Sequence, residues 1–324
     1  MTRYNSPQNR NFNGAPKRAA IIGAGLIGRG WAIVFARSKW RVSVYDTDFS
    51  ALNDARIAVA EQLRVLDELG LCTQPGDILR RIEYESDLSA AVNNARYVQE
   101  CGPENLNTKK ALFSELDGLL PSHVILASST SGFTASEISG HLQGKHRVLV
   151  AHPVNPPHLV PLVEIAPAES TDPAVVNAAR ELMIALNQVP ITVQREIPGF
   201  VLNRLQGALL NEAMHLVEGG NATPEDIDKA VRDGLGLRWS FMGPFETIDL
   251  NAPAGLADYA CRYGKMYRKM AQSRTAPPEW RGKPVERLER FRRAALKRDD
   301  IADRQGWRDY RLAALVSHKR QQEN

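Results

Sequence analysis

The chain has 324 residues and a mass of 35.9 kDa, about twice the ~150 residues typical of one domain, so we expect two domains. Hydrophobic residues make up 43% and charged residues 24%, which excludes an intrinsically disordered chain. No stretch approaches the ~20 apolar residues of a membrane span, and the polar, Asn-rich start differs from a signal peptide. We therefore expect a soluble, cytoplasmic protein with no membrane partner.

The first part of the chain predicts strands that alternate with helices. A polar arm, expected to be mobile, covers residues 1–17, and a short buried strand, RAAIIG, runs from it into a glycine-rich turn and a helix, GAGLIGRGWAIVFARS. A strand at 41–45 and a helix at 50–70 follow, and further apolar runs stand at YVQEC, VILAS and RVLVAHP. A helix at 173–187 precedes VPITV, which is expected to close the sheet. Because alternating strands and helices pair in parallel, the pattern predicts an α/β fold with a mostly parallel, Rossmann-type sheet.

Only helical patterns follow this part. A long apolar helix is predicted at 200–218, directly after Pro198 and Gly199, and further helices at 223–233, at 244–263 and in two basic segments. We therefore divide the chain into a sheet domain at 18–196 and an all-α domain at 197–324. The helix at 200–218 has little to cover it within so small a domain, so self-association is expected.

The excess of positive charge lies at the end of the chain. Residues 274–324 hold 14 Lys or Arg against 8 Asp or Glu, whereas the rest holds 27 against 29. These basic residues are mixed with acidic ones and with apolar residues at helical spacing, namely Trp307, Tyr310, Leu312, Leu315 and Val316. The pattern favours an amphipathic helix for packing or subunit contact over a nucleic-acid-binding surface.

The three cysteines are too far apart to suggest a shared site. Cys72, Cys101 and Cys261 form no CxxC and show no spacing of metal ligands. We expect buried, reduced thiols and neither a disulfide framework nor a metal site.

The glycine-rich turn has the features of a dinucleotide site. Gly23, Gly25 and Gly28 form G-x-G-x-x-G between a strand and a helix, where backbone amides can approach a pyrophosphate. Asp46 ends the second strand, 18 residues after the last glycine, where its carboxylate can accept both hydroxyls of an adenosine ribose. This carboxylate and Asp48 would repel a 2′-phosphate, so the predicted cofactor is NAD rather than NADP. A plain turn with a capping Asp46 is the structural alternative.

A histidine and a glutamate follow at the expected ligand edge of the sheet. His152 ends the apolar run RVLVA, and Glu164 stands 12 residues later in an apolar, proline-flanked segment where a carboxylate needs a partner. Paired with Glu164, His152 would be a general base that takes the proton of an alcohol as hydride leaves carbon. The alternative is a buried pair that only stabilises the turn. We assign no role to the other histidines, His158 included.

The motifs GAGLIG, ECGPEN, SSTSG, HPVNPP, LVE, PGFVLNR and MGPFE stand in the order found in the 3-hydroxyacyl-CoA dehydrogenase superfamily, which residues 18–250 resemble. The resemblance implies that His152 and Glu164 form the catalytic dyad and that Ser131 and Asn203 are hydrogen-bond partners of the reacting oxygen. It also implies NAD contacts from the glycine-rich turn, the second strand and three later segments: Leu26, Ile27, Asp46, Glu104, Lys109 and Asn155. A homodimer is expected in part from this resemblance.

The chain resembles the lambda-crystallin and L-gulonate 3-dehydrogenase branch of this superfamily more closely, through AHPVNPPHLVPLVE, GFVLNRLQGALLNEA, DGLGLRWSFMGPFETIDLNA and WRDYRLAALVSHKR, which extends the resemblance to nearly the whole chain. L-Carnitine dehydrogenases resemble it at GLRWSFMG. One departure concerns coenzyme A: where acyl-CoA enzymes carry a lysine for its phosphates, this chain reads RVLDELG, with Asp67 and Glu68, although Arg64 is close.

Together these features predict an NAD-dependent dehydrogenase for the 3-hydroxyl of a small hydroxy acid, with L-gulonate as the leading substrate. The domain at 18–196 would bind NAD and the domain at 197–324 the substrate and a second subunit. Arg238 could pair with a substrate carboxylate, or bond to helix carbonyls as a structural residue. The alternatives are oxidation of 3-hydroxybutyryl-CoA or of L-carnitine, and a crystallin-like structural protein that binds NADH.

Overall fold

The computed structural model describes residues 17–274 and 276–322, which form two compact units. The first unit comprises the chain up to Arg204 together with the segment from Asp303 onward, and the second comprises Leu205–Ala302. The expected arm at 1–17 lies outside the described residues except for Lys17.

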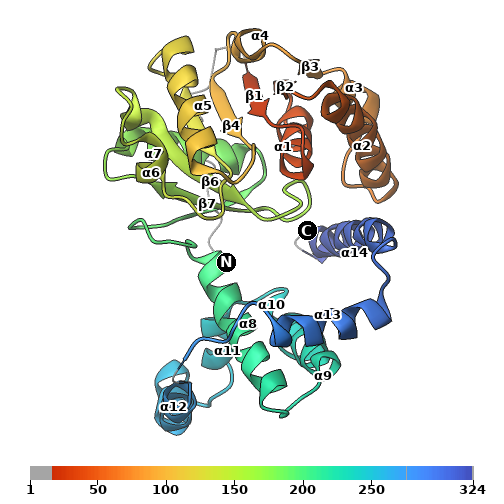
Figure 1. The fold of residues 1–324 in the computed structure, drawn as a ribbon, viewed down its shortest axis with the longest axis vertical. Helices are drawn as coiled ribbons and strands as arrows, with labels where there is room; N and C mark the ends of the chain where they lie inside the picture. Colours follow the sequence, from red (N-terminus) through yellow and green to blue (C-terminus); the bar gives the residue numbers. More distant parts are fainter. Residues whose placement is uncertain (1–16, 275, 323–324) are drawn as a thin grey trace. The chain divides into compact units, whose positions relative to one another are not determined.

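The first unit is built on an eight-stranded sheet in the order β3-β2-β1-β4-β5-β6-β7-β8 (Figure 1). Neighbouring strands are parallel except for the pair β6 and β7, which is antiparallel. The strands are β1 (Arg18–Ile22), β2 (Arg41–Tyr45), β3 (Ile82–Glu85), β4 (Tyr97–Glu100), β5 (Ile125–Ser128), β6 (Val148–Pro153), β7 (Leu162–Pro167) and β8 (Val189–Thr192). The mostly parallel, Rossmann-type sheet is confirmed.

Helices cover both faces of this sheet, because consecutive residues of its strands are apolar and point to opposite faces. In β1, Ala19 and Ile21 belong to one buried core, and Ala20 and Ile22 belong to another on the opposite face. Helices α1, α2 and α7 contribute to the first core and α4, α5 and α6 to the second. The connecting helices are α1 (Leu26–Arg37), α2 (Phe49–Glu68), α3 (Pro75–Leu79), α4 (Leu88–Val92), α5 (Leu106–Leu119), α6 (Ala135–Ser139), the 3-10 turn η1 (Lys145–Arg147) and α7 (Pro173–Ala185).

Six strand predictions are confirmed, and two strands, β3 and β7, were not predicted. The segment VPITV does close the sheet as β8. Strand β3 was not predicted because IEYE is short and half polar. Strand β7 was not predicted because prolines flank LVEIAP and suggest a loop. The second omission matters most, since β7 carries Glu164.

The second unit is entirely helical in its described residues, as predicted. Its helices are α8 (Leu202–Glu218, whose first turn belongs to the first unit), α9 (Pro224–Lys229), the π-helical η2 (Ala230–Leu235), α10 (Gly236–Trp239), α11 (Pro244–Asp249), α12 (Leu256–Gln272) and α13 (Lys283–Ala295). The single helix predicted at 244–263 is wrong, because it divides into α11 and α12. Pro253 lacks a backbone donor and Gly255 has a φ of +78°, so the intervening turn cannot continue the helix.

The final helix, α14 (Ile301–Gln322), corrects the expected domain boundaries. From Asp303 onward it belongs to the first unit rather than to the all-α domain expected at 197–324, and the first unit also includes the start of α8 up to Arg204. Ala313 is buried in the core of the first unit, and Leu312 and Val316 pack against it. The Ser317 hydroxyl donates to the Leu69 carbonyl at 2.9 Å. The amphipathic pattern in the basic tail therefore serves packing.

None of the described helices is both long enough and apolar enough to cross a bilayer. The cysteines are free, as expected, but Cys261 is exposed and Cys72 and Cys101 are only partly buried, so the expectation of buried thiols is wrong. Cys261 lies on α12, a helix without buried residues, which explains its exposure. Within residues 17–274 and 276–322, no group of three or more potential ligands gathers into a metal site.

Candidate active site

The three glycines of the turn after β1 meet three different steric demands. Gly23 has a φ of +115°, and a Cβ there would lie 2.7 Å from the Cys101 carbonyl oxygen. At Gly28, a Cβ would lie 1.8 Å from the Gly23 carbonyl oxygen, so α1 could not pack against the turn. A Cβ at Gly25 would meet no atom within 4 Å. Two glycines are therefore required by the fold, and the third leaves open space at the N-terminus of α1, where a pyrophosphate would bind.

Asp46 lies beside this turn, directly after β2. Its carboxylate accepts hydrogen bonds from the backbone amides of Ala24, at 2.8 Å, and Asp48, at 3.0 Å. A carboxylate offers about four acceptor positions, so these two bonds leave capacity for ribose hydroxyls. Asp48 caps α2 by accepting from the Ser50 amide, which contributes with the Ser50 hydroxyl to a lowered pKa of the Asp48 carboxyl. The turn and Asp46 thus fit the adenosine half of NAD.

His152 and Glu164 face each other across the antiparallel pair of strands. They are direct partners in the register of β6 and β7, so both side chains project from the same face of the sheet. His152 Nδ1 lies 2.8 Å from Glu164 Oε2, and both residues are buried, with Glu164 fully inaccessible. The interval of 12 residues between them therefore spans the connection at 154–161, after which the chain runs antiparallel to β6.

The Glu164 carboxylate is held in its charged form by three donors. Its other oxygen accepts from the backbone amides of Val201 and Leu202, at 2.8 and 2.9 Å, where the chain enters α8. Burial raises the pKa of Glu164, but the hydrogen bond from His152 and those from the two amides outweigh burial and lower it. The anionic carboxylate fixes the proton on His152 Nδ1 and leaves Nε2 to accept another.

Ser131 and Asn203 extend this pair into a chain of four residues. Ser131 Oγ lies 3.1 Å from His152 Nε2, and Asn203 Nδ2 donates to the Ser131 carbonyl oxygen at 3.2 Å. Ser131 is exposed and Asn203 partly exposed, so the chain opens toward solvent at the end opposite Glu164. The four predicted catalytic residues come from β6, β7, the loop after β5 and the start of α8, and the fold brings them together.

Glu104 organises the loop that carries Ser131. Its Oε1 accepts from the Thr130 hydroxyl at 2.6 Å and from the amides of Ser131 and Gly132 at 3.0 and 2.8 Å. Burial raises the pKa of Glu104, but the Thr130 hydroxyl, the charge of Lys109 and the two amides together lower it. Glu104 therefore acts on the site as an anion that positions Ser131, and its side chain is exposed enough to touch a cofactor as well.

Lys109 is placed differently from its predicted role as a direct NAD contact. Its side chain is buried, and Nζ donates to both oxygens of Glu100, at 2.8 and 2.9 Å, with Glu104 at 3.4 Å. Ser128 Oγ donates to the same Glu100 carboxylate at 2.5 Å. This geometry favours a positioning role, in which Lys109 supports Glu104 from beneath the loop.

The other predicted contacts are distributed more widely. Leu26 is exposed and Ile27 half-buried at the start of α1, beside the open position of Gly25. Asn155 is exposed two residues after the end of β6 and makes no side-chain hydrogen bond to the four predicted catalytic residues. Arg238 lies on α10 in the second unit, where it is exposed and its guanidinium forms no hydrogen bond with the described residues, so helix carbonyls do not hold it.

Two further residues that shape the site, Glu100 and Phe200, were not predicted from the sequence. Glu100 ends β4 and binds Lys109, Ser128 and the Gly102 amide while almost fully buried. The sequence does contain a signal for Glu100, because a carboxylate at the carboxyl end of a mainly apolar strand, YVQE, indicates a buried polar contact. Phe200 packs its ring 5.5 Å from the His152 ring and is buried with a φ of 49°. No pattern in the sequence distinguishes this phenylalanine from an ordinary core residue.

A glycine-rich turn with an acidic residue after β2, and a buried Glu–His pair aimed at an exposed serine, define an NAD-dependent dehydrogenase that acts on an alcohol. Comparison with known proteins agrees. Residues 18–197 match the NAD binding domain of 3-hydroxyacyl-CoA dehydrogenase, and residues 199–295 match its C-terminal domain. The chain belongs to the 3-hydroxyacyl-CoA dehydrogenase family and is an NAD-dependent oxidoreductase of the hydroxy-acid and hydroxyacyl class.

Two relatives and one solved structure are similar to most of this chain. A lambda-crystallin homolog of Bos taurus is 41% identical over 316 residues, covering 95% of this chain and 97% of the relative. An L-carnitine dehydrogenase of Streptomyces griseus is 38% identical over 249 residues, covering 76% and 74%. Among solved structures, the NAD+-dependent dismutase 5-formyl-3-hydroxy-2-methylpyridine 4-carboxylic acid 5-dehydrogenase has a TM-score of 0.79 at 28% identity, covering 92% and 97%. The predicted likeness to the lambda-crystallin branch is confirmed.

Proposed function

We propose that the protein oxidises the 3-hydroxyl of a small, free hydroxy acid to the 3-keto acid, with L-gulonate to 3-dehydro-L-gulonate as the leading reaction. The family supports the chemistry, and the named substrates of two relatives, L-carnitine and a pyridine carboxylic acid, carry no coenzyme A. The likeness to lambda-crystallin homologs supports the sugar-acid branch.

The charge of α2 is the observation that carries the choice of a free acid. Arg64, the one basic residue near the position where acyl-CoA enzymes place a lysine, binds Glu61 at 2.7 Å and also pairs with Glu68. Asp67 adds a further negative charge on the same turn. A cation that already holds two carboxylates offers little attraction to the phosphates of coenzyme A, which α2 would instead repel.

The site geometry supports His152 as the base of this reaction. NAD, when bound, supplies the acceptor for the hydride that leaves the substrate carbon. His152 Nε2 takes the hydroxyl proton, and the ionised Glu164 at Nδ1 stabilises the imidazolium that results. In the reverse direction the same imidazolium returns the proton to the keto oxygen.

Ser131 and Asn203 are proposed to hold the substrate oxygen beside His152. Ser131 Oγ lies within hydrogen-bond distance of His152 Nε2, and the Asn203 side-chain amide donates to the Ser131 carbonyl oxygen. Arg238 is proposed as the partner of the substrate carboxylate, supported by its exposure and its unengaged guanidinium.

The experiment is a comparison of substrates at mildly alkaline pH. Purified protein with NAD is followed by NADH absorbance with L-gulonate, L-carnitine and 3-hydroxybutyryl-CoA in parallel. Turnover of L-gulonate with at least tenfold lower kcat/KM for the thioester is the expected result. A preference for 3-hydroxybutyryl-CoA would overturn the free-acid proposal, and a preference for L-carnitine would move the substrate to the other named branch.

The crystallin-like alternative is separated in the same preparation. NADH binding, measured by fluorescence, together with no turnover of any substrate, would favour a structural NADH-binding protein. The His152→Asn variant is the matched control, because it should reproduce that behaviour by removing the base alone.

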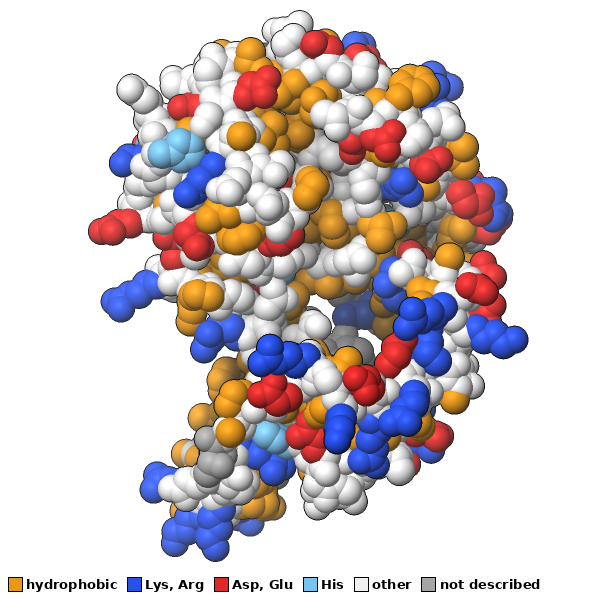
Figure 2. Space-filling model, in the orientation of Figure 1, with side chains coloured by type: hydrophobic (Ala, Val, Ile, Leu, Met, Phe, Trp, Pro, Cys, Tyr) orange, Lys and Arg blue, Asp and Glu red, His pale blue; other side chains and the backbone are white. Residues whose placement is uncertain are grey.

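We also propose that the second unit contributes to substrate binding and to a homodimer. Its described residues include only four buried side chains, Met214, Val217, Thr247 and Pro278, too few for the core of an independent unit of this length. Hydrophobic side chains reach the surface over α12 (Figure 2). A second copy of the chain is the proposed cover.

The free thiols support a reducing, cytoplasmic location, which stays a prediction.

A further inference from the structure

A buried glutamine on β4 lies on the face of the sheet opposite the predicted catalytic pair. Gln99 is fully inaccessible, and Tyr97, two residues earlier on the same face, belongs to the core that α1 covers. Ala151 belongs to that core too, so His152, the next residue of β6, projects from the other face. Gln99 can therefore act on the reaction only through other residues.

Both polar atoms of the Gln99 side chain are engaged. Nε2 donates to the Ser129 hydroxyl at 2.7 Å and to the Ala151 carbonyl oxygen at 3.1 Å, and Oε1 accepts from the Tyr97 hydroxyl at 2.7 Å. Because a carbonyl oxygen can only accept, the atom that faces Ala151 must be the amide nitrogen. The Tyr97 hydroxyl holds the amide in this orientation, so both amide protons point to segments that lead into the site.

The contact with Ala151 fixes the end of β6. The register of β5 and β6 ends at Ser128 and Val150, so the next residues of β6 extend beyond the strand beside them. The Gln99 amide reaches past the end of β5 and supplies a donor to the Ala151 carbonyl. Because His152 follows Ala151 directly, this bond holds the backbone from which the imidazole projects.

The contact with Ser129 fixes the start of the loop that carries Ser131. Both lone pairs of the Ser129 hydroxyl are used, since it accepts from Trp31 Nε1 at 3.2 Å as well as from Gln99. Its proton then points to Cys101 Sγ, 3.3 Å away. The Ser129 side chain thus has one orientation, which anchors the loop from the core side two residues before Ser131.

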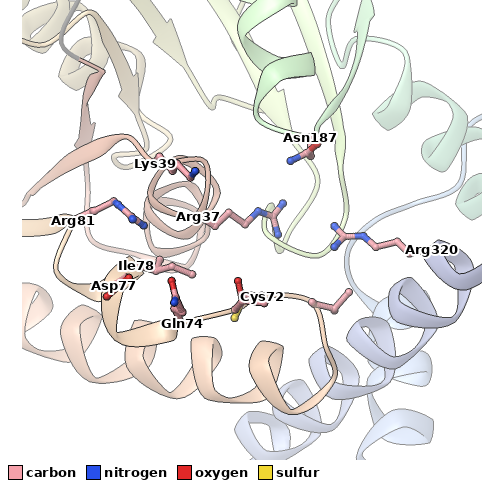
Figure 3. Close-up of a pocket in the computed structure, with 11 residues that line it drawn as sticks. Arg37, Lys39, Cys72, Gln74, Asp77, Ile78, Arg81, Asn187 and Arg320 are labelled. Carbon is pink, nitrogen blue, oxygen red and sulfur yellow. The ribbon is translucent and has the colours of Figure 1, made fainter. Parts of the chain in front are cut away.

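A ligand in the cavity at the far end of α1 cannot account for this network. Figure 3 shows that cavity, which Arg37 lines at the end of the helix, whereas Trp31 and Gln99 do not line it. The network instead fixes the ends of two neighbouring strands relative to one another, and a satisfied buried polar network is rigid. The geometry that it fixes includes the 3.1 Å between Ser131 Oγ and His152 Nε2.

We propose that Gln99 is a positioning residue, which sets the contact between Ser131 and His152 by holding the ends of β5 and β6 together. This role rests on the proposed function, since the contact matters for turnover only if His152 is the base. The contact itself needs no substrate, so it can also be measured in the resting protein. Loss of the Gln99 amide would let Ser131 and His152 move apart while the fold and the dinucleotide turn persist.

The first test is Gln99→Met, which keeps the length of the side chain and removes both donors. It should lower kcat about 10–100-fold for whichever of L-gulonate, L-carnitine and 3-hydroxybutyryl-CoA the wild type turns over, because a small misplacement of the base is costly. KM and NADH affinity should stay within about twofold of the wild type. Val98→Ala is the matched control, because Val98 is buried on the same strand but packs into the core on the opposite face. It should lower the melting temperature and leave kcat unchanged.

Nitrogen NMR of the histidine side chains tests the same role without turnover. The His152 signals are identified by their loss in His152→Asn, and Ser131→Ala shows where the Nε2 signal lies when no hydroxyl faces it. Gln99→Met should move the signal toward that position, and Val98→Ala should leave it at the wild-type position. If the wild type turned over none of the three substrates but the signal moved in this way, the result would count against the proposed function and support the role of Gln99.

Two results would overturn the positioning role: a wild-type kcat in folded Gln99→Met, or a His152 Nε2 signal that stays at its wild-type position in that variant. If Gln99→Met does not fold, Tyr97→Phe decides, because it removes only the bond that orients the amide. Tyr97→Phe should reduce kcat and move the Nε2 signal in the same direction, each by a smaller amount. No change in either quantity would contradict the role equally.

Discussion

At the scale of single residues, the site depends on one buried carboxylate that determines which nitrogen of His152 is free. Glu164 receives His152 Nδ1–H and two backbone amides, so Nε2 faces Ser131 with its lone pair available. We expect His152→Asn to reduce kcat by about 10²–10⁴-fold, because the asparagine amide is no base at neutral pH. Steady-state rates with the preferred substrate measure the loss of kcat, and NADH titration by fluorescence measures cofactor affinity separately.

NADH affinity should stay within about twofold of the wild type in this variant, since His152 is not part of the glycine-rich turn. Glu164→Gln should be less severe, because the imidazole is kept while its charge partner is lost. A wild-type rate in His152→Asn would remove the histidine from the mechanism. Loss of both turnover and NADH binding would indicate misfolding, which circular dichroism would detect.

A second histidine, His158, is expected to affect stability rather than catalysis. Burial and then the nearby Arg37 lower its pKa from 6.5 to about 3 in the folded protein. His158 is therefore protonated near pH 6.5 in the unfolded chain but only near pH 3 in the folded protein. The folded state is stabilised fully above pH 6.5, and this stabilisation is lost as the pH falls below that value. Between pH 7.5 and 5.5 the loss should be about 1.4 kcal/mol.

Urea unfolding of the wild type and of His158→Gln at these two pH values measures this contribution. The variant should lose about 1.4 kcal/mol less than the wild type over the interval, whatever its stability at pH 7.5. Equal losses in the two proteins would show that His158 takes up its proton in the folded state as readily as in the unfolded state.

Residues with an unusual chemical setting were the ones that the sequence could identify. His152 and Asp46 stand out because each follows a predicted strand directly, Glu164 because it interrupts an apolar segment, and Ser131 and Asn203 because family motifs contain them. Lys109 was assigned to the cofactor because the motif names the residue but not its surroundings. Only the fold shows that Glu100, nine residues earlier, engages its ammonium group.

At the scale of elements, two glycines in the turn from β1 into α1 are expected to serve different purposes: Gly28 is needed for folding, and Gly25 for binding the cofactor. Gly25→Ala should fold normally, since its Cβ meets no protein atom within 4 Å and its φ of −70° suits alanine. The same methyl group enters the space expected for the pyrophosphate, so NADH affinity should fall by about tenfold or more, or 1.4 kcal/mol. Fluorescence titration and thermal unfolding check both statements.

Gly28→Ala is the control for this prediction, with the effects reversed. Its Cβ would lie 1.8 Å from the Gly23 carbonyl oxygen, so the helix must move away from the turn and the melting temperature should drop. If Gly25→Ala bound NADH as tightly as the wild type, the pyrophosphate would not lie over this glycine.

Elements with a strong hydrophobic period were predicted well, and elements defined by their partners were not. The helices at 49–68 and 173–185 match their apolar pattern closely. Strand β7 was missed because its identity depends on pairing with β6 across a proline-rich connection. The placement of α14 was also wrong, because a helical stripe shows that a helix packs but not which core receives it.

At the scale of the whole molecule, buried residues are distributed very unequally. The sheet unit contains three clusters of buried apolar side chains, whereas the described part of Leu205–Ala302 has almost none. Its longest complete helix, α12, has no buried residue and carries a stripe of Tyr259, Tyr263, Met266, Tyr267 and Met270 along one face. A helix with such a face is stable in water only when something covers it.

A homodimer through this face is the expected solution, and light scattering coupled to gel filtration measures it directly. The wild type should elute with about twice the mass of 35.9 kDa at micromolar concentration. Met266→Arg places a charge in the middle of the stripe and should shift the protein toward the monomer and lower its melting temperature. Cys261→Arg adds the same group to the opposite side of α12 and should leave the mass unchanged. A monomeric wild type would contradict the dimer, while a dimer insensitive to Met266→Arg would place the interface on another part of the helical unit.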